Sequence, residues 1–301
     1  MKVFVTGSTG FVGRYVVAEL KARGHTPVLL VRPGSEAKLP NLEGVKLVPG
    51  DVNQPDQYIR ALSEVDAVIH LVGIIREFAS RGITFDIMHY QATRNITRAA
   101  IDSGVRRFIH MSANGAGPQG VSDYQITKWR AEELVMNSRL KWTVFRPSMI
   151  FGDSHGLPEF TSQLADVIRH APWLPIFGGG KYRMDPIAVE DVARCFVAAL
   201  ENQRTVGRAY CLGGGNPTRF SEIAQTIGKA MGKPRTRTIS VPFWLVLPVA
   251  RAMEGFPFFP ITSDQLLMLR QGNICARLDY MDVFDITPIP FTYRTMGYLK
   301  T

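Results

Sequence analysis

The 301-residue sequence has few cysteines, no long apolar run and no low-complexity tract or internal repeat. Its three cysteines, Cys195, Cys211 and Cys275, show no CxxC spacing, which predicts neither a zinc site nor a disulfide framework and favours a reducing compartment. The most apolar stretch, residues 241–250, contains two prolines and is about half the ~20 residues that a membrane-spanning helix needs. No signal-peptide pattern opens the chain, so we expect a cytoplasmic protein.

The formal net charge of +9 raises the question of an anionic partner. Lysines and arginines are scattered, and the densest cluster is Lys233, Arg235 and Arg237. Without a recognition motif, this distribution predicts no nucleic-acid partner. Contact with anionic lipid, which would place the protein peripherally on the inner face of a membrane, stays an alternative. The oligomeric state is left open.

The first half of the chain alternates short β-rich runs with amphipathic helical stretches. Runs of Val, Ile and Leu without alternation are typical of strands buried on both faces, so the fold class is α/β with a doubly wound parallel (Rossmann) sheet. The predicted strands are residues 3–6, 27–31, 45–49, 67–73, 107–112 and 142–147, and the predicted helices are 12–20, 58–63, 87–101 and 126–136.

The alternation weakens after Pro147, although residues 186–212 predict one more helix and strand. We therefore expect a dinucleotide-binding domain of residues 1–151 and 187–215. Residues 152–186 and 216–301 would form a substrate-binding cap over the carboxyl edge of the sheet, where such folds bind ligands.

The strongest motif is the glycine-rich turn TGSTGFVG between the first strand and the first helix. Gly7 permits the tight turn, Gly10 lets the backbone approach a pyrophosphate, and Gly13 allows helix and strand to pack closely. The helix amino terminus offers N–H groups to phosphate oxygens. The sequence thus predicts a nicotinamide dinucleotide site made by Gly7, Ser8, Thr9, Gly10, Phe11, Val12 and Gly13.

The residue after the second strand distinguishes the two nicotinamide dinucleotides. An acidic residue there binds the ribose 2′-hydroxyl of NAD(H), but this chain has Arg32, whose guanidinium suits the 2′-phosphate of NADP(H). NADP(H) is therefore the predicted cofactor, with NAD(H) as the alternative; Arg32 could instead be a solvated residue that stacks on adenine. Asp51, after the third strand, could bind the adenine amino group or cap a turn.

Tyr124 and Lys128 are four residues apart on a predicted helix and therefore share a face. A lysine beside a tyrosine favours the phenolate and can also hold the nicotinamide ribose, so Tyr124 is a candidate general acid or base.

Together these motifs resemble the extended or atypical short-chain dehydrogenase/reductases, also called the NAD-dependent epimerase/dehydratase family. The resemblance covers roughly the first 215 residues and implies that Val52, Leu71, Val72, Gly73, Lys128 and Pro147 also contact the cofactor. It rests on TGSTGFVG, Gly50-Asp51-Val52, His70-Leu71-Val72-Gly73, Ala92-Thr93-Arg94-Asn95, Tyr124 to Lys128 with Ala131-Glu132, Arg146-Pro147-Ser148 before Phe151-Gly152, and Val189-Glu190-Asp191-Val192.

HLVGI after the fourth strand and residues 260–270 look most like one branch of this family. That branch contains the Rossmann-type accessory subunit of respiratory complex I and its bacterial relatives. It holds NADP(H) but is not established as a hydride-transfer catalyst. The resemblance implies a respiratory-complex partner as an alternative to a small-molecule substrate.

One position departs from the catalytic pattern of the family. The Ser or Thr that binds the substrate oxygen aligns with Ala113, and Ser112 falls one residue early. Adjacent strand residues point to opposite faces, so Ser112 faces away unless the strand has ended. Ser112 is the candidate third catalytic residue, and Asn114 is an alternative donor.

Two further groups have open interpretations. His70 and His110 lie in apolar strands and are interpreted as core histidines, with no second ligand spaced to make a metal site.

Six apolar residues near Lys233, Arg235, Arg237 and Arg251 form either the core of the cap or an interfacial surface. They are Phe243, Trp244, Leu247, Phe256, Phe258 and Phe259.

Three functions are compatible with the sequence. The first is an NADP(H)-dependent oxidoreductase acting on a carbonyl, alcohol or sugar-like substrate, with the aromatic cap hinting at a quinone or lipid. The second is a non-catalytic NADP(H)-binding assembly protein of a respiratory complex or membrane surface. The third, a sugar-nucleotide epimerase/dehydratase, would favour NAD(H), and Arg32 counts against it.

Overall fold

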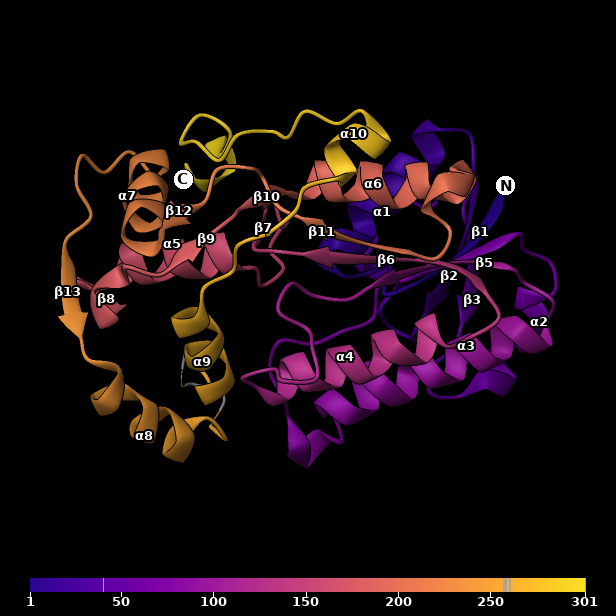
Figure 1. Ribbon diagram of the computed structural model, residues 1–301, viewed down its shortest axis with the longest axis horizontal. Coiled ribbons are helices and arrows are strands. Elements are labelled where there is room, and N and C mark those ends of the chain that lie inside the picture. Colours follow the sequence, from indigo (N-terminus) through magenta and orange to yellow (C-terminus); the bar gives the residue numbers. More distant parts are fainter. Residues whose placement is uncertain (40, 257–258, 260, 301) are drawn as a thin grey trace.

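The structure, a computed structural model, describes the chain except residues 40, 257, 258, 260 and 301. A seven-stranded parallel sheet has the order β11-β6-β5-β4-β1-β2-β3, which confirms the predicted doubly wound fold (Figure 1). The chain runs from β1 outward to β3 and then returns to the other side of β1, so the strand order reverses between β1 and β4. The strands are β1 (Lys2–Thr6), β2 (Thr26–Val31), β3 (Lys46–Pro49), β4 (Ala67–His70), β5 (Arg107–Met111), β6 (Lys141–Pro147) and β11 (Arg208–Leu212).

Helices cover both faces of this sheet because its strands are apolar on both sides. Val3, Val5 and Ile69 pack into one cluster with α1 and α6. Phe4, Val68 and Phe108 pack into a second cluster with α2, α3 and α4. The helices are α1 (Phe11–Ala22), α2 (Ile59–Leu62), α3 (Ala92–Asp102), α4 (Asp123–Met136), α6 (Val189–Glu201) and α10 (Tyr280–Phe284).

A π-helical turn, η4 (Asp86–Gln91), precedes α3, where the sequence predicts one continuous helix over residues 87–101. Because its hydrogen bonds span one residue more than in an α-helix, the turn shifts the preceding side chains around the axis. Turns of this kind are frequent at functional sites. Here η4 packs against α4.

The remaining segments form a smaller lobe with its own apolar cluster, made of residues such as Phe151, Ile176 and Ile223. Its strands pair two by two, as β7 with β10, β8 with β13 and β9 with β12. The strands are β7 (Ile150–Phe151), β8 (Leu174–Phe177), β9 (Arg183–Met184), β10 (Ile187–Ala188), β12 (Thr218–Arg219) and β13 (Thr238–Val241). The helices are α5 (Phe160–His170), α7 (Phe220–Ala230), α8 (Phe243–Met253) and α9 (Ser263–Gln271).

The aromatic segment of this lobe is partly core and partly exposed surface. Phe243, Leu247 and Phe259 pack against the apolar cluster, whereas Trp244 and Phe256 are exposed. Phe258, also part of the predicted patch, lies outside the described residues, as does residue 260 of the late motif. In the described part of the chain, no helix is long and apolar enough to cross a membrane.

The cysteines correct one expectation. Cys211, in β11, and Cys275, after α9, form a disulfide with their Cα atoms 5.7 Å apart, whereas Cys195 is free and buried. The prediction of no disulfide is wrong because sequence spacing does not show that β11 and the segment after α9 meet in the fold. The cysteines therefore no longer favour a reducing compartment.

Breaking this bond should destabilise the protein. The cysteines are 64 residues apart, and closing a loop of that length stabilises a chain by about 4 kcal/mol in the chain-entropy account. We expect reductant to lower the melting temperature of the native chain and to leave that of a Cys211→Ser/Cys275→Ser variant unchanged. Alkylation of the oxidised, unfolded chain should label Cys195 alone; labelling of all three cysteines would contradict the bond.

Candidate functional site

The glycine turn joins β1 to α1 at the point where the strand order reverses. Gly7 has φ +78°, a left-handed conformation that favours glycine, and its carbonyl accepts a hydrogen bond from the Gly10 N–H (3.1 Å). A Cβ atom at Gly13 would lie 2.2 Å from the Gly7 oxygen, and one at Gly7 would lie 3.0 Å from the Leu71 carbonyl carbon. The turn, α1 and the end of β4 therefore pack with no room for side chains at these positions.

The amino end of α1 suits an anion. Gly10 caps the helix without a side-chain hydrogen bond, and its first turn, which starts with Phe11, Val12 and Gly13, contains no acidic residue. N–H groups of a first helical turn lack partners within the helix and attract phosphate oxygens. Ser8 is buried, and its hydroxyl has no hydrogen-bond partner among the described residues. Thr9 beside it is half-buried. These features fit a dinucleotide pyrophosphate.

The residues expected near adenosine follow β2 and β3. Arg32 comes directly after β2, and its side chain is exposed at the carboxyl edge of the sheet. Asp51 accepts the Asn53 N–H through Oδ1 (2.8 Å), which is the turn-capping role left open by the sequence. Val52 is buried in the sheet cluster. Arg32 is thus the most accessible of the predicted adenosine contacts.

Three further predicted cofactor residues follow β4. Leu71 is buried, and Val72 presents its carbonyl oxygen to the Lys128 ammonium at 3.4 Å. A Cβ atom at Gly73 would lie 2.7 Å from Lys128 Nζ, so glycine leaves space for that cation. Pro147 ends β6 and is buried. The fold therefore gathers these segments and the glycine turn along one edge of the sheet.

One face of α4 carries three ionisable residues at four-residue spacing: Tyr124, Lys128 and Glu132. Lys128 is buried and also donates to the Met111 carbonyl at 3.1 Å. Burial lowers its pKa to about 8, and Glu132 opposes this shift. Glu132 is fully buried and accepts hydrogen bonds from Arg146 Nε at 3.0 Å. The helix face thus places a cation at the ends of β4 and β5.

Tyr124 departs from the expected electrostatics. Its ring makes edge-on contacts with Phe85 (5.7 Å between centroids) and His89 (5.2 Å). Burial raises the pKa of Tyr124 to about 12, opposite to the lowering that the sequence predicts from Lys128. At neutral pH Tyr124 is therefore a phenol that can donate a proton.

Ala113, which the family resemblance aligns with the substrate-oxygen donor, is buried and has no hydroxyl. Ser112 directly follows β5, and its N–H continues the ladder by donating to the Phe145 carbonyl. At two-residue spacing, Ser112 lies on the same face as Phe108 and His110. Its side chain is thus directed to the sheet face that α4 covers. The Ser112 hydroxyl is buried with no hydrogen-bond partner among the described residues. Asn114, the alternative donor, gives its amide hydrogen to Asn273 Oδ1 (2.6 Å).

The two predicted core histidines are buried and stacked, with ring centroids 5.5 Å apart. His70 contacts the hydroxyls of Thr6 (2.6 Å) and Thr93 (3.0 Å). Burial lowers the pKa of His70 to about 3, so its ring is neutral. In the part of the chain that the structure describes, no group of three or more His, Cys, Asp or Glu side chains is arranged to hold a metal ion.

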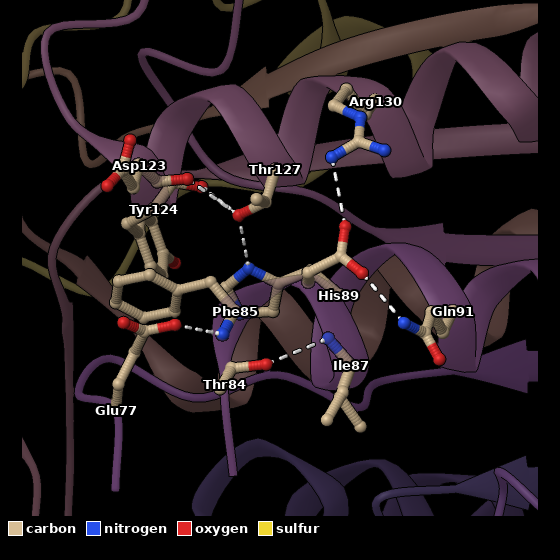
Figure 2. A network of polar contacts seen from close by, with 11 residues as sticks. Glu77, Thr84, Phe85, Ile87, His89, Gln91, Asp123, Tyr124, Thr127 and Arg130 are labelled. Atoms are coloured by element: carbon tan, nitrogen blue, oxygen red, sulfur yellow. Dashed lines mark hydrogen bonds and ion pairs between the residues drawn. The ribbon is translucent and has the colours of Figure 1, made fainter. Parts of the chain in front are cut away.

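His89 is a site residue that sequence reasoning missed. Figure 2 shows its ring hydrogen-bonded to Thr127 Oγ1 (2.9 Å) beside Tyr124, and Nε2 contacts the Ile74 backbone. Burial lowers the pKa of His89 to about 2. Its place in a predicted helix gave no functional signal, because only the packing of η4 against α4 brings it next to Tyr124.

The smaller lobe closes on the amino end of α4. Asp264, in α9, accepts the Tyr124 N–H at 3.0 Å, and Gln271 accepts a hydrogen bond from the Gln125 amide at 2.8 Å. With the contact between Asn273 and Asn114, these bonds position α9 over the carboxyl edge of the sheet.

Filling the space beside Gly7 should disrupt the site. In Gly13→Ala, the new methyl group would clash with the Gly7 carbonyl, and such overpacking costs about 1–3 kcal/mol of stability. We expect a lower melting temperature and loss of dinucleotide binding by calorimetry. The matched control is Gly297→Ala, where a Cβ atom meets nothing within 4 Å. If both variants bind equally well, the close packing at Gly13 does not shape the site.

Comparisons with known proteins agree with this geometry. The chain is 31% identical over 285 residues to the mitochondrial NADH dehydrogenase (ubiquinone) 1 alpha subcomplex subunit 9 of Arabidopsis thaliana, covering 89% of this chain and 68% of that protein. The Mus musculus subunit of the same name is 28% identical, with 98% and 79% covered. These relatives match the branch that the late motifs resemble.

Solved structures share the fold. UDP-glucose 4-epimerase from Thermotoga maritima, crystallised with UDP-glucose, has a TM-score of 0.77 at 19% identity, covering 99% of this chain and 96% of that one. Bordetella bronchiseptica WbmH in complex with NAD+ has a TM-score of 0.75 at 18% identity, with 98% and 96% covered. A family model described as "NAD dependent epimerase/dehydratase family" matches residues 3–213. Together with the glycine turn and its Rossmann sheet, this match shows that the chain belongs to the NAD-dependent epimerase/dehydratase family.

Proposed function

We propose that the protein binds NADP(H) along the carboxyl edge of its sheet and transfers hydride to or from a carbonyl or alcohol substrate beneath the cap. The observation that carries the proposal is the convergence of the glycine turn, the amino end of α1 and Lys128 at the reversal of strand order. Residues 1–151 and 187–215 would hold the dinucleotide, and 152–186 and 216–301 would enclose the substrate.

Each predicted cofactor residue has a role in this proposal. The turn from Gly7 to Gly13 and the amino end of α1 take the pyrophosphate, and Arg32 takes the 2′-phosphate. Asp51 and Val52 lie towards the adenine. The segment 71–73 and Pro147 border the nicotinamide half, and Lys128 holds its ribose. NAD(H) is the competing cofactor, and only the charge of Arg32 argues against it.

NADP(H), when bound, supplies or accepts the hydride. Tyr124, as a phenol with a pKa of about 12, would donate its proton to the substrate oxygen in the reductive direction. The buried Lys128 would stabilise the phenolate that remains. Ser112, whose buried hydroxyl has no hydrogen-bond partner among the described residues, is proposed to polarise the substrate oxygen. Because burial opposes ionisation of Tyr124, the phenol is in the protonation state that the reductive direction requires.

A non-catalytic accessory role is the second candidate. It is favoured by Ala113 at the donor position and by the engagement of Asn114 with Asn273. Two relatives named above are mitochondrial NADH dehydrogenase subunits, which supports a respiratory-complex partner. NADP(H) would then be a structural group. A sugar-nucleotide epimerase, the third reading, is disfavoured by Arg32.

The proposed location is the cytoplasm, with a peripheral position on the inner face of a membrane as the alternative. In the cytoplasm, the bond between Cys211 and Cys275 would face a reducing glutathione and thioredoxin pool.

The cofactor assignment predicts that Arg32 selects NADP(H). Losing a charge-assisted contact with phosphate costs about 1.5–3 kcal/mol, so Arg32→Ala should weaken NADPH binding roughly 10- to 100-fold and leave NADH binding nearly unchanged. Calorimetric titration measures both. Arg106→Ala, an exposed arginine at the opposite edge of the sheet, is the matched control. A preference for NADPH that survives Arg32→Asp would refute the role of Arg32.

Catalysis predicts a requirement for the Tyr124 hydroxyl. In Tyr124→Phe, kcat with candidate carbonyls or quinones should fall roughly 100- to 10,000-fold, while NADPH affinity stays unchanged. Tyr90→Phe, a half-buried tyrosine on η4, is the control. Undiminished turnover in Tyr124→Phe would rule out this acid. If the native chain turns over no carbonyl but retains NADPH, the accessory role is favoured.

A further inference from the structure

Helix α8 is apolar on every side and yet lies at the surface. Apart from Arg251, its residues from Phe243 to Met253 are all apolar, but Ala250 is the one that is fully buried. Trp244 is 77% exposed, and Leu245 and Val249 are about half exposed, at 51% and 47%. A helix that is hydrophobic all round is normally enclosed by other elements.

Contacts near both ends of α8 fix how the helix sits on the cap. Phe243 contacts Phe177 (6.4 Å between ring centroids) and Tyr182 (6.2 Å) in the cap. Arg76, from the segment after β4, donates to the backbone carbonyls of Glu254 (2.9 Å) and Phe259 (2.6 Å), just beyond the helix. Because α8 is fixed in this orientation, the side chains of Trp244 and Leu245 stay exposed to solvent.

A cationic hollow lies at the start of β13. It has a volume of about 470 Å³, and its charged lining consists of Arg169, Lys233, Arg235 and Arg237, with no acidic residue among the lining residues. Asp166 pairs with Arg169 (2.6 Å), which leaves the other cations unneutralised by that carboxylate. The sequence from residue 223 to 253 contains five Lys or Arg and no Asp or Glu.

Strand β13 connects the hollow to α8. Arg237 precedes the strand, and Pro242, the N-cap of α8, follows it, so these two residues are roughly 17 Å apart along the strand. Ile239 on β13 and Trp173 beside β8 are each 52% exposed, and the Arg237 guanidinium lies 5.8 Å from the Trp173 ring centroid. Figure 1 shows β13 and α8 at the end of the molecule farthest from the sheet.

We propose that this surface, here called the outer face of the cap, docks the protein peripherally on an anionic phospholipid bilayer. It comprises Trp173, Arg235, Arg237, Ile239, Trp244 and Leu245. The tryptophans and aliphatic side chains enter the headgroup–acyl boundary, and the cations of the hollow bind lipid phosphates.

Charge complementarity favours lipid over a protein partner. The lining cations have one sign, which matches the uniform negative potential of an anionic leaflet, and exposed tryptophans beside cations are typical of interfacial anchors. With 11 residues, α8 is about half the length that spans a bilayer, so it lies in the interface. The docking goes beyond the proposed hydride transfer and does not depend on it.

The test is co-sedimentation of the full chain with vesicles of phosphatidylcholine alone or mixed with phosphatidylglycerol. We expect binding to the anionic vesicles, little binding to the neutral ones, and weakening with salt. Each cation near an anionic surface contributes about fivefold in affinity, so Arg235→Gln/Arg237→Gln should lower binding roughly 25-fold. Trp244→Ser/Leu245→Ser should lower it roughly tenfold or more.

Matched controls separate docking from misfolding and from cofactor binding. Ile75→Ser and Arg106→Gln change an exposed apolar residue and an exposed cation outside the outer face, and they should bind vesicles like the native chain. All variants should keep their melting temperature and NADPH affinity, so failure of docking and failure of the cofactor proposal are distinguishable. Brominated lipid should quench the fluorescence of Trp173 and Trp244. Replacing either tryptophan by Phe should remove the part of the quenching that this residue contributes.

Several outcomes would overturn the proposal. Equal binding to neutral and anionic vesicles, or no effect of either double variant, would show that the outer face does not contact lipid. Competition by inorganic phosphate without any vesicle binding would assign the hollow to a free anion. Self-association of the lipid-free chain that Trp244→Ser/Leu245→Ser abolishes would assign α8 to a second copy.

Discussion

The buried ammonium group of Lys128 constrains the geometry of the candidate site through contacts with three separate segments. A buried cation must be compensated, and here the carbonyls of Val72 and Met111 and the nearby Glu132 carboxylate provide that compensation. Because α4 carries Tyr124 one turn before Lys128 and Glu132 one turn after it, fixing the ammonium fixes both neighbours. The pairing of Glu132 with Arg146 then ties α4 to β6. The same contacts that satisfy one charge thus set the geometry of the candidate site.

The cap has two sides with different physical tasks. Its inner side touches the site through Asp264, which accepts the Tyr124 N–H. Ser263, the preceding residue of α9, donates to Glu254 at the end of α8. The outer face of the cap is therefore connected to the amino end of α4 by consecutive residues of α9. Glu254, at the end of α8, is thus hydrogen-bonded to the residue that precedes the α9 contact with α4.

The electrostatics of Tyr124 show where a motif stops being informative. The spacing of Tyr124 and Lys128 correctly predicted a shared helix face, but the phenol and the ammonium are both desolvated by their surroundings. Desolvation acts against the charged form of each, which raises the pKa of Tyr124 and lowers that of Lys128. The same spacing of Tyr and Lys can therefore hold a protonated phenol in one environment and a phenolate base in another. Holding a dinucleotide requires backbone geometry, whereas using it for chemistry requires specific side chains.

The sequence by itself determined the doubly wound sheet, the glycine turn and the shared face of Tyr124 and Lys128. These features depend on local patterns: buried strands of Val and Ile, the lack of a side chain at Gly7 and Gly13, and four-residue helical spacing. Only the tertiary structure decided the disulfide of Cys211 and Cys275, the contact of Asn114 with Asn273, and the place of His89 beside Tyr124. It also divided the aromatic segment into the packed Phe243 and the exposed Trp244. Each of these depends on which distant segments meet in the fold, and that information is absent from the spacing of residues along the chain.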